Sequence, residues 1–124
     1  MTNKLVKILL VEDDPLMQRL IQLYMKQYPA EIDMSGNGRI AAKRLQKNEY
    51  DLLITDLQMP EVDGATLIRN IRKDGKMLPV IVLSSYDKVS IERMIDEPNI
   101  DSLRKPFESA DLIGLIEKMT AGKN

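Results

Sequence analysis

The sequence contains no cysteine and no histidine among its 124 residues. Without cysteine there are no disulfides, no thiolate metal sites and no cysteine nucleophile. Without histidine the chain has neither a Ser-His-Asp triad nor an imidazole-ligated zinc of its own. A metal bound to this chain must therefore be held by oxygen atoms, which favours hard cations such as Mg²⁺, Mn²⁺ or Ca²⁺.

A charge excess and a long apolar run are also missing. The formal net charge is -1, and no basic stripe indicates contact with nucleic acid or an anionic membrane. Met1–Lys4 lead into a short apolar stretch that ends in acids, unlike a signal peptide, and no apolar run approaches the roughly 20 residues of a membrane span. We therefore expect a cytoplasmic protein that contacts neither nucleic acid nor membrane directly. The length predicts a single domain over 1–124, with its core at about 5–120.

Aliphatic segments with strand character alternate with segments of helical periodicity. Most of the strand segments are short and nearly continuous in apolar residues, which is typical of strands buried on both faces of a parallel sheet, whereas 30–34 alternates like an edge strand. Asp14 and Pro15 suit the start of the first helix, which we expect to continue to Tyr28 and to end at Pro29. The alternation predicts an α/β fold with helices on both faces of the sheet. The expected strands are 5–11, 30–34, 52–55, 79–83 and 100–104, and the expected helices lie around 15–28, 40–45, 67–71, 89–95 and 112–119.

Polar residues follow four of the expected strands at the point where each strand ends. In an open α/β sheet these carboxyl ends meet at one edge, and ligands bind there. The residues concerned are Glu12, Asp13 and Asp14 after the first strand, Asp56 after the third, Ser84 and Ser85 after the fourth, and Lys105 after the fifth. Four clusters that are distant in the sequence are thus expected to converge.

Carboxylates brought this close either raise one another's pKa or need a cation. Asp13 and Asp56, with one neighbouring acid, make an oxygen site that suits Mg²⁺, with Mn²⁺ as an alternative. Asp56 is the best candidate nucleophile, since a carboxylate that forms an acyl phosphate is established chemistry. Lys105 would place a positive charge on a phosphoryl oxygen, and Ser84 would donate a hydrogen bond to another. The small side chain of Ser85 leaves space for a phosphodonor, and Asp14 is read as a helix cap.

Five motifs, in order and each at a strand end or in the loop that follows one, are similar to those of bacterial two-component response-regulator receiver domains. The resemblance extends over roughly residues 5 to 120. The motifs are Val11-Glu12-Asp13-Asp14-Pro15, Asp56-Leu57-Gln58-Met59-Pro60, Asp63-Gly64, Leu83-Ser84-Ser85 and Lys105-Pro106-Phe107.

The resemblance implies a flavodoxin-like, doubly wound (βα)5 three-layer sandwich with a five-stranded parallel sheet in the order 2-1-3-4-5. It implies a metal bound by Asp13, Asp56 and the backbone carbonyl of Gln58, with Glu12 holding the metal's waters. Ser84 would be the switch hydroxyl. The phosphoryl donor would be a phosphohistidine of a sensor histidine kinase or a histidine phosphotransfer protein. The chain would be a signalling switch that catalyses its own phosphorylation and dephosphorylation, not a turnover enzyme, and a phosphorylation-dependent dimer and the output partner stay open.

Two positions, Ser102 and Tyr86, bear on how this receiver would transmit its signal and how long it would keep its phosphate. Receivers usually carry Tyr or Phe three residues before the lysine, where this chain has Ser102, so a signal would have to travel without that aromatic. Tyr86 lies where receivers adjust the lifetime of their phosphate, and we hypothesise that its bulk restricts attacking water and slows autodephosphorylation. Met59-Pro60 is interpreted as loop architecture, and Gly64 as relief of a backbone constraint.

Three other functions are alternatives to this interpretation. A pseudo-receiver that binds a protein partner constitutively stays open because of Ser102. A haloacid-dehalogenase-type phosphatase would need a second acid two residues after the nucleophile, where this chain has Gln58. A flavodoxin would need a Ser/Thr/Gly-rich phosphate loop after the first strand, where Glu12, Asp13 and Asp14 would repel a phosphate.

Overall fold

The computed structural model describes residues 5–59 and 61–121. Within them, five strands alternate with five helices and form one parallel sheet in the order β2-β1-β3-β4-β5, as predicted. The strands are β1 (Val6–Val11), β2 (Ala30–Ser35), β3 (Leu52–Asp56), β4 (Val80–Ser84) and β5 (Ile100–Arg104). The helices are α1 (Pro15–Tyr24), α2 (Gly38–Lys47), α3 (Gly64–Lys73), α4 (Lys88–Met94) and α5 (Ser109–Met119).

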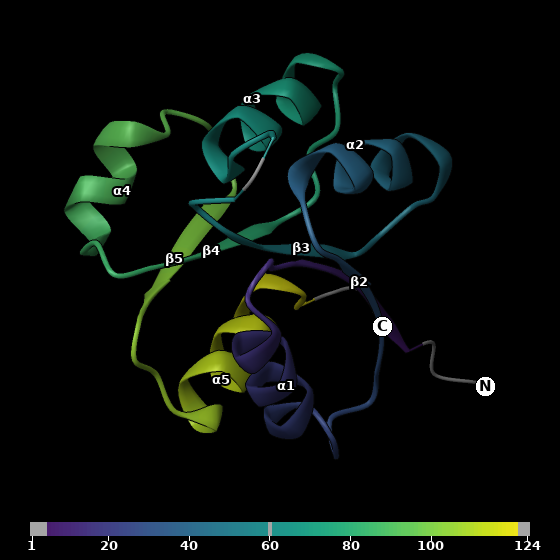
Figure 1. The fold of residues 1–124 in the computed structure, drawn as a ribbon, viewed down its shortest axis with the longest axis vertical. Coiled ribbons are helices and arrows are strands. Elements are labelled where there is room, and N and C mark those ends of the chain that lie inside the picture. Colours follow the sequence, from purple (N-terminus) through teal and green to yellow (C-terminus); the bar gives the residue numbers. More distant parts are fainter. Residues whose placement is uncertain (1–4, 60, 122–124) are drawn as a thin grey trace.

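The helices cover both faces of the sheet, so the molecule has three layers (Figure 1). Helices α1 and α5 lie together on one face, while α2, α3 and α4 lie on the other. Successive residues of a strand point to opposite faces, and each face therefore receives its own apolar set. Leu9, Leu53 and Val82 pack under α2, α3 and α4, whereas Ile8, Ile54 and Ile81 pack under α1 and α5.

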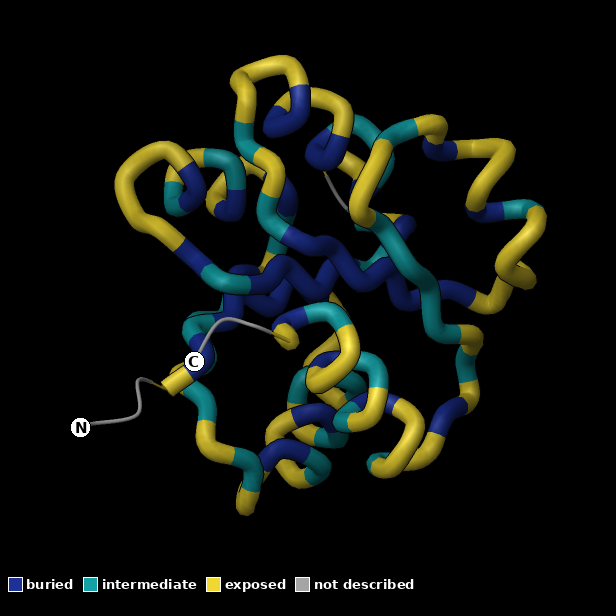
Figure 2. Tube along the Cα trace, turned by 180° about the vertical axis from the view of Figure 1, so that it is seen from behind, coloured by how far each residue is buried: buried dark blue, intermediate teal, exposed yellow. Residues whose placement is uncertain are grey.

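The three inner strands are the most deeply buried part of the chain, and yellow, exposed segments surround them (Figure 2). Every residue of β4 is buried, and in β3 only the last residue, Asp56, is partly exposed. The outer strands β2 and β5 are mostly half-buried, which confirms that 30–34 forms an edge. Asp56 and Ser84 therefore lie at the edge of the sheet, each at the end of a buried inner strand.

Helix starts follow the sequence closely because side chains cap them. Asp14 accepts a hydrogen bond from the Leu16 backbone N–H at 3.0 Å, as predicted for a cap of α1. Asp63 and Asp87 accept equivalent bonds at the starts of α3 and α4. These caps place helix starts directly after the loops that leave β1, β3 and β4.

The predicted end of the first helix is wrong by four residues. Helix α1 ends at Tyr24, and the next residues form tighter turns in which Lys26 N–H donates to the Leu23 carbonyl and Tyr28 N–H to the Met25 carbonyl. Tyr28 packs against the α1–α5 core from this turn, so its spacing imitates one more turn of helix. The turn brings the chain to Ala30, which pairs with Val6 at the start of β2.

The residues at helical spacing in the expected helix 89–95 do not all reach the core. Val89 and Met94 are exposed, at 56% and 42%, and the buried residues of this segment are Ile91 and Ile95. A helix of seven residues has room for little more than one turn of buried positions on one face. No helix in the described ranges is long and apolar enough to cross a membrane. Pro60 of the Met59-Pro60 motif and Met1–Lys4 lie outside the described residues.

Candidate functional site

Three carboxylates meet at the carboxyl edge of the sheet. Glu12 and Asp13 follow β1, and Asp56 is the last residue of β3. One oxygen from each lies within 4.8 Å of the others, and we call these three residues the carboxylate cluster. The neighbouring strands β1 and β3 produce this meeting, since Val11 pairs with Thr55 and the acids come directly after that pair.

Glu12 is the buried member of the cluster, with its side chain only 1% exposed. Its Oε2 accepts a hydrogen bond from Asp14 N–H at 3.1 Å, and its backbone carbonyl accepts one from the Gln18 side chain at 2.6 Å. Burial raises the pKa of Glu12 to about 7, with the charges of Asp56 and Asp13 adding to the effect, while the Asp14 hydrogen bond and Lys105 oppose it.

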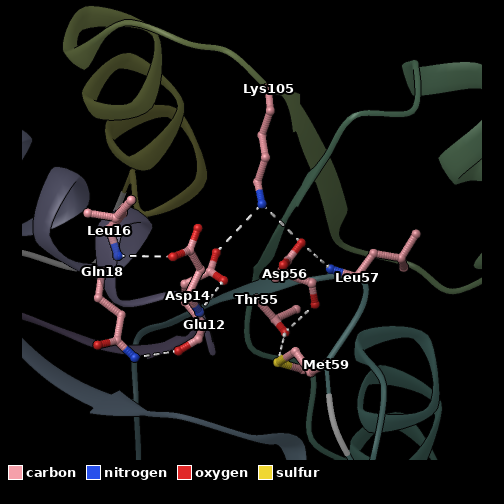
Figure 3. Close-up of polar contacts among 9 residues, drawn as sticks. All are labelled: Glu12, Asp14, Leu16, Gln18, Thr55, Asp56, Leu57, Met59 and Lys105. Atoms are coloured by element: carbon pink, nitrogen blue, oxygen red, sulfur yellow. Dashed lines mark hydrogen bonds and ion pairs between the residues drawn. The ribbon is translucent and has the colours of Figure 1, made fainter.

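Asp56 lies between a backbone donor and a lysine (Figure 3). Leu57 N–H donates to Asp56 Oδ1 at 2.8 Å, and Lys105 Nζ lies 3.3 Å from the same oxygen. Lys105 reaches down from the end of β5 and also lies 3.6 Å from Glu12 Oε1. One ammonium group thus faces two carboxylates that belong to different strands, which leaves the cluster with net negative charge.

The carboxylate cluster fits a hard divalent cation by its chemistry. All its donors are oxygens, the atoms that Mg²⁺ and Mn²⁺ prefer. Glu12 Oε1 is buried and accepts no hydrogen bond within the described part of the chain, with only the lysine at ion-pair distance. A buried carboxylate oxygen without a hydrogen bond is costly, and a cation with its waters would satisfy it.

Two glycines let the loop after β3 close against the site. A Cβ on Gly64 would lie 2.3 Å from the Asp56 carbonyl oxygen, so only glycine permits this approach. Gly64 N–H donates to the Leu57 carbonyl at 2.8 Å. Gly38, at the start of α2, packs equally tightly on Val62 of the same loop. The constraint expected at Gly64 is therefore a close contact with the backbone of Asp56 itself.

Ser84, at the end of β4, and the loop residues Ser85 and Tyr86 follow one another beside the loop that carries Gln58. Ser84 is 4% exposed, and its Oγ accepts a hydrogen bond from Tyr86 N–H at 3.0 Å. Ser85 is exposed beside it. Tyr86 and Gln58 line the same open hollow of about 290 Å³, together with Met94 of α4. The structure thus brings the two loops that carry Gln58 and Tyr86 next to each other.

Comparison with known proteins agrees with this geometry. Residues 8–117 match the family described as "Response regulator receiver domain". The response regulator receiver protein CpdR of Brucella abortus is 34% identical over 114 residues, which cover 91% of this chain and 95% of CpdR. The chain belongs to the response regulator receiver family.

Other members extend the comparison. The response regulator ArlR of Staphylococcus saprophyticus is 30% identical over 93% of this chain, which spans only 52% of ArlR. The receiver domain of the Francisella response regulator 1452 superposes with a TM-score of 0.87 at 26% identity, over 96% of this chain and 99% of that one. The receiver domain of the sensor histidine kinase PA1611 from Pseudomonas aeruginosa has a TM-score of 0.84 at 26% identity, with coverages of 96% and 100%. That structure has a magnesium ion coordinated in its active site cleft.

In this receiver domain, Ser102 is half-buried next to a small hollow of about 50 Å³ between α4 and β5. The neighbouring Asp101 forms ion pairs with Lys88 of α4 and with Lys118 of α5. Partial burial acts to raise the pKa of Asp101, but the Lys88 contact, the Ser102 N–H bond and the charge of Lys118 outweigh it and hold this pKa below its usual value. Charged groups thus connect β5 to both flanking helices around Ser102.

Two features of the receiver site were not predicted from the sequence. Gly38 is the first residue of α2, and nothing in the neighbouring sequence indicates that it packs on Val62. Arg104, directly before the lysine, donates from Nε to the Ser85 carbonyl at 3.1 Å. The position of Arg104 at the end of the last strand was the one available signal, because that edge carries the site.

Proposed function

We propose that this receiver domain accepts a phosphoryl group on Asp56 from a phosphohistidine of a sensor histidine kinase or a histidine phosphotransfer protein. The observation that carries the proposal is the meeting of three carboxylates within 4.8 Å, with Lys105 Nζ at 3.3 Å from Asp56. We further propose that residues 1–124 act as one receiver unit with a core at about 5–120.

In the proposed reaction, an oxygen of the Asp56 carboxylate attacks phosphorus. The new P–O bond forms as the P–N bond to the donor imidazole breaks, and the imidazole nitrogen keeps that electron pair and takes up a proton. Lys105 contributes a charge-assisted contact to one phosphoryl oxygen. The Ser84 hydroxyl proton, which its bond with Tyr86 N–H leaves free, donates to another.

Residues Asp13 and Asp56, the Gln58 carbonyl and Glu12 would hold Mg²⁺, or Mn²⁺ in its place. The cation would supply neutralisation of the charge that collects between the carboxylates and the phosphoryl oxygens. The magnesium ion in the active site cleft of the PA1611 receiver supports this assignment by similarity. Glu12, whose pKa is raised to about 7 in the absence of a cation, would then be ionised and satisfied.

The test is incubation with Mg²⁺ and acetyl phosphate, followed by intact mass measurement. We expect one added phosphoryl group, which Asp56→Asn abolishes because the amide cannot act as the nucleophile. Asp96→Asn, an exposed acid outside the carboxylate cluster, is the matched control and should behave as wild type. A chain that binds Mg²⁺ yet gains no phosphate would instead be a pseudo-receiver, a constitutive binding module.

A further inference from the structure

The end of β5 donates hydrogen bonds to two successive carbonyls, those of Ser84 and Ser85, and so holds the start of the loop after β4. Lys105 backbone N–H donates to the Ser84 carbonyl at 2.8 Å, as the end of the sheet ladder. Arg104, paired with Ser84 in the β4–β5 register, donates from its side-chain Nε to the Ser85 carbonyl at 3.1 Å. The side chain of Arg104 therefore continues the ladder by one residue, past the point where backbone pairing stops.

The held loop is short and starts at Ser84, whose hydroxyl lies on the strand next to β3. Asp56 pairs with Leu83 across the β3–β4 ladder, and Ser84 is the next residue. The Ser84 Oγ already accepts a bond from Tyr86 N–H, so its position depends on where Ser85 and Tyr86 lie. The Ser85 carbonyl belongs to the peptide between Ser85 and Tyr86. When Arg104 holds this carbonyl, it also holds the turn that orients the Ser84 hydroxyl.

The contact uses only one of the five donors of the guanidinium group. Its charge also acts on Asp87, the cap of α4, because the charge of Arg104 contributes to lowering the pKa of that carboxyl, after the hydrogen bonds of Ser90. The contact that holds the loop is therefore the Arg104 hydrogen bond to the Ser85 carbonyl. Arg104 is an exposed residue, so little apolar burial competes with this polar role.

We propose that Arg104 is a positioning residue of the phosphoacceptor site. Its Nε–H holds the Ser85 carbonyl and thereby sets where the Ser84 hydroxyl stands when a phosphoryl group reaches Asp56. The inference rests on the proposed phosphoacceptor function and deepens it by assigning a role to a residue outside the cluster. Arg104 acts through the loop and needs no contact with the phosphoryl group.

Three substitutions separate the hydrogen bond from the charge. Arg104→Gln places an amide N–H at the same number of bonds from the backbone as Nε and removes the charge. Arg104→Lys keeps the charge but has a methylene at that point. Arg104→Met loses both the donor and the charge and keeps a stem of similar length. The positioning role predicts that Gln behaves as wild type and that Lys and Met behave alike.

The first measurement is the rate of phosphate uptake from acetyl phosphate with Mg²⁺, read by intact mass. We expect uptake to slow about threefold to tenfold in the Met and Lys variants, the range that one net hydrogen bond supports. Gln should stay within about twofold of wild type on the same scale. The urea midpoint of each variant checks that the fold is unchanged. Equal rates in all variants, or slowing in Gln and Met with Lys unchanged, would overturn the proposal, the second outcome assigning the effect to charge.

A second measurement keeps the inference testable if wild type takes up no phosphate, which would refute the proposed function alone. Amide hydrogen exchange at Tyr86 reports the turn directly, because this N–H donates to Ser84 Oγ. We expect exchange about threefold to tenfold faster in the Met and Lys variants and unchanged in Gln. Wild-type exchange in the Met variant would show that the loop holds itself, and the positioning role would be lost.

Discussion

The carboxylate cluster and the α4–β5 face lie on the same sheet, yet they are held in different ways. Glu12 and Asp56 lie at the ends of two inner strands, β1 and β3, whose backbones are buried and paired on both sides. Helix α4 lies over the last strand and buries little apart from Ile91, with the half-buried Ser102 and a hollow of about 50 Å³ beneath it.

At the α4–β5 face, where apolar packing is limited, ion pairs provide many of the contacts between the strand and the helices. Lys88 and Lys118 meet Asp101 with side chains that are 58% and 74% exposed, and such pairs are weak and screened by salt. Elements held this way open locally at small free-energy cost. The carboxylate cluster therefore rests on buried strands paired on both sides, whereas the neighbouring face can move without unfolding the core.

The two regions should differ most in how much free energy of unfolding is lost when a buried side chain is truncated to alanine. Leu83→Ala in β4 should lower the free energy of unfolding by about 4 kcal/mol, because this side chain is fully buried between the sheet and helices α1 and α5, where the surrounding core cannot collapse into the space. Ile91→Ala in α4 should cost about 2 kcal/mol, since the side chain borders a hollow and the short helix can relax. Urea denaturation measures both. Equal losses would mean that α4 is packed as firmly as the inner sheet.

Magnesium should stabilise the folded chain through the carboxylate cluster. At a concentration of about 100 times its Kd, Mg²⁺ should raise the free energy of unfolding by about 2.7 kcal/mol, because it binds the folded chain alone. Asp13→Asn should remove most of this gain, and the exposed Asp96→Asn should keep it. The measurement is thermal unfolding with and without Mg²⁺. A gain that survives Asp13→Asn would place the cation elsewhere.

Glu12 should make the cation-free protein less stable as pH rises. Its pKa is about 7 in the fold against 4.5 in the unfolded chain, so the folded state binds the proton more tightly. The stability that this proton confers is complete below pH 4.5 and is lost as pH rises to about 7, at no more than about 1.4 kcal/mol per pH unit.

Glu12→Gln isolates that contribution, because other carboxylates titrate in the same range. The difference in unfolding free energy between the two proteins, measured in EDTA, should slope downward between pH 4.5 and about 7 and be level above it. A flat difference would show that the Glu12 carboxyl is solvated in the fold.

The smallest effect is expected at Asp101. Lys88→Met should lower the free energy of unfolding by less than about 1 kcal/mol, and added salt should shrink the difference. Amide exchange in α4 should nevertheless increase, because Lys88 joins that helix to β5. Lys118→Met, which removes a longer and more exposed contact from α5, is the control that should leave α4 exchange unchanged. Equal exchange in both variants would mean that apolar packing alone holds α4.

The fold and the candidate site were largely readable from the chain because both depend on local signals. Continuous aliphatic runs predicted the inner strands, and the acids, serines and lysine at their ends predicted a common edge. The end of α1 was misplaced because Tyr28 packs from a turn with helical spacing, and spacing cannot tell the two apart. The spacing of Val89 and Met94 predicted a helix but not their exposure, because periodicity reports a face of a helix and not what lies beneath it.

By itself, then, the sequence determined a parallel α/β receiver with Asp56, Asp13 and Lys105 at one edge, since strand ends and residue types are written along the chain. Tertiary structure decided which distant groups share that edge at bonding distance. Only there does Gly38 meet Val62, Glu12 become a buried carboxylate with a raised pKa, and Arg104 reach the Ser85 carbonyl. These contacts depend on how loops from separate strands pack together, and no local pattern encodes that packing.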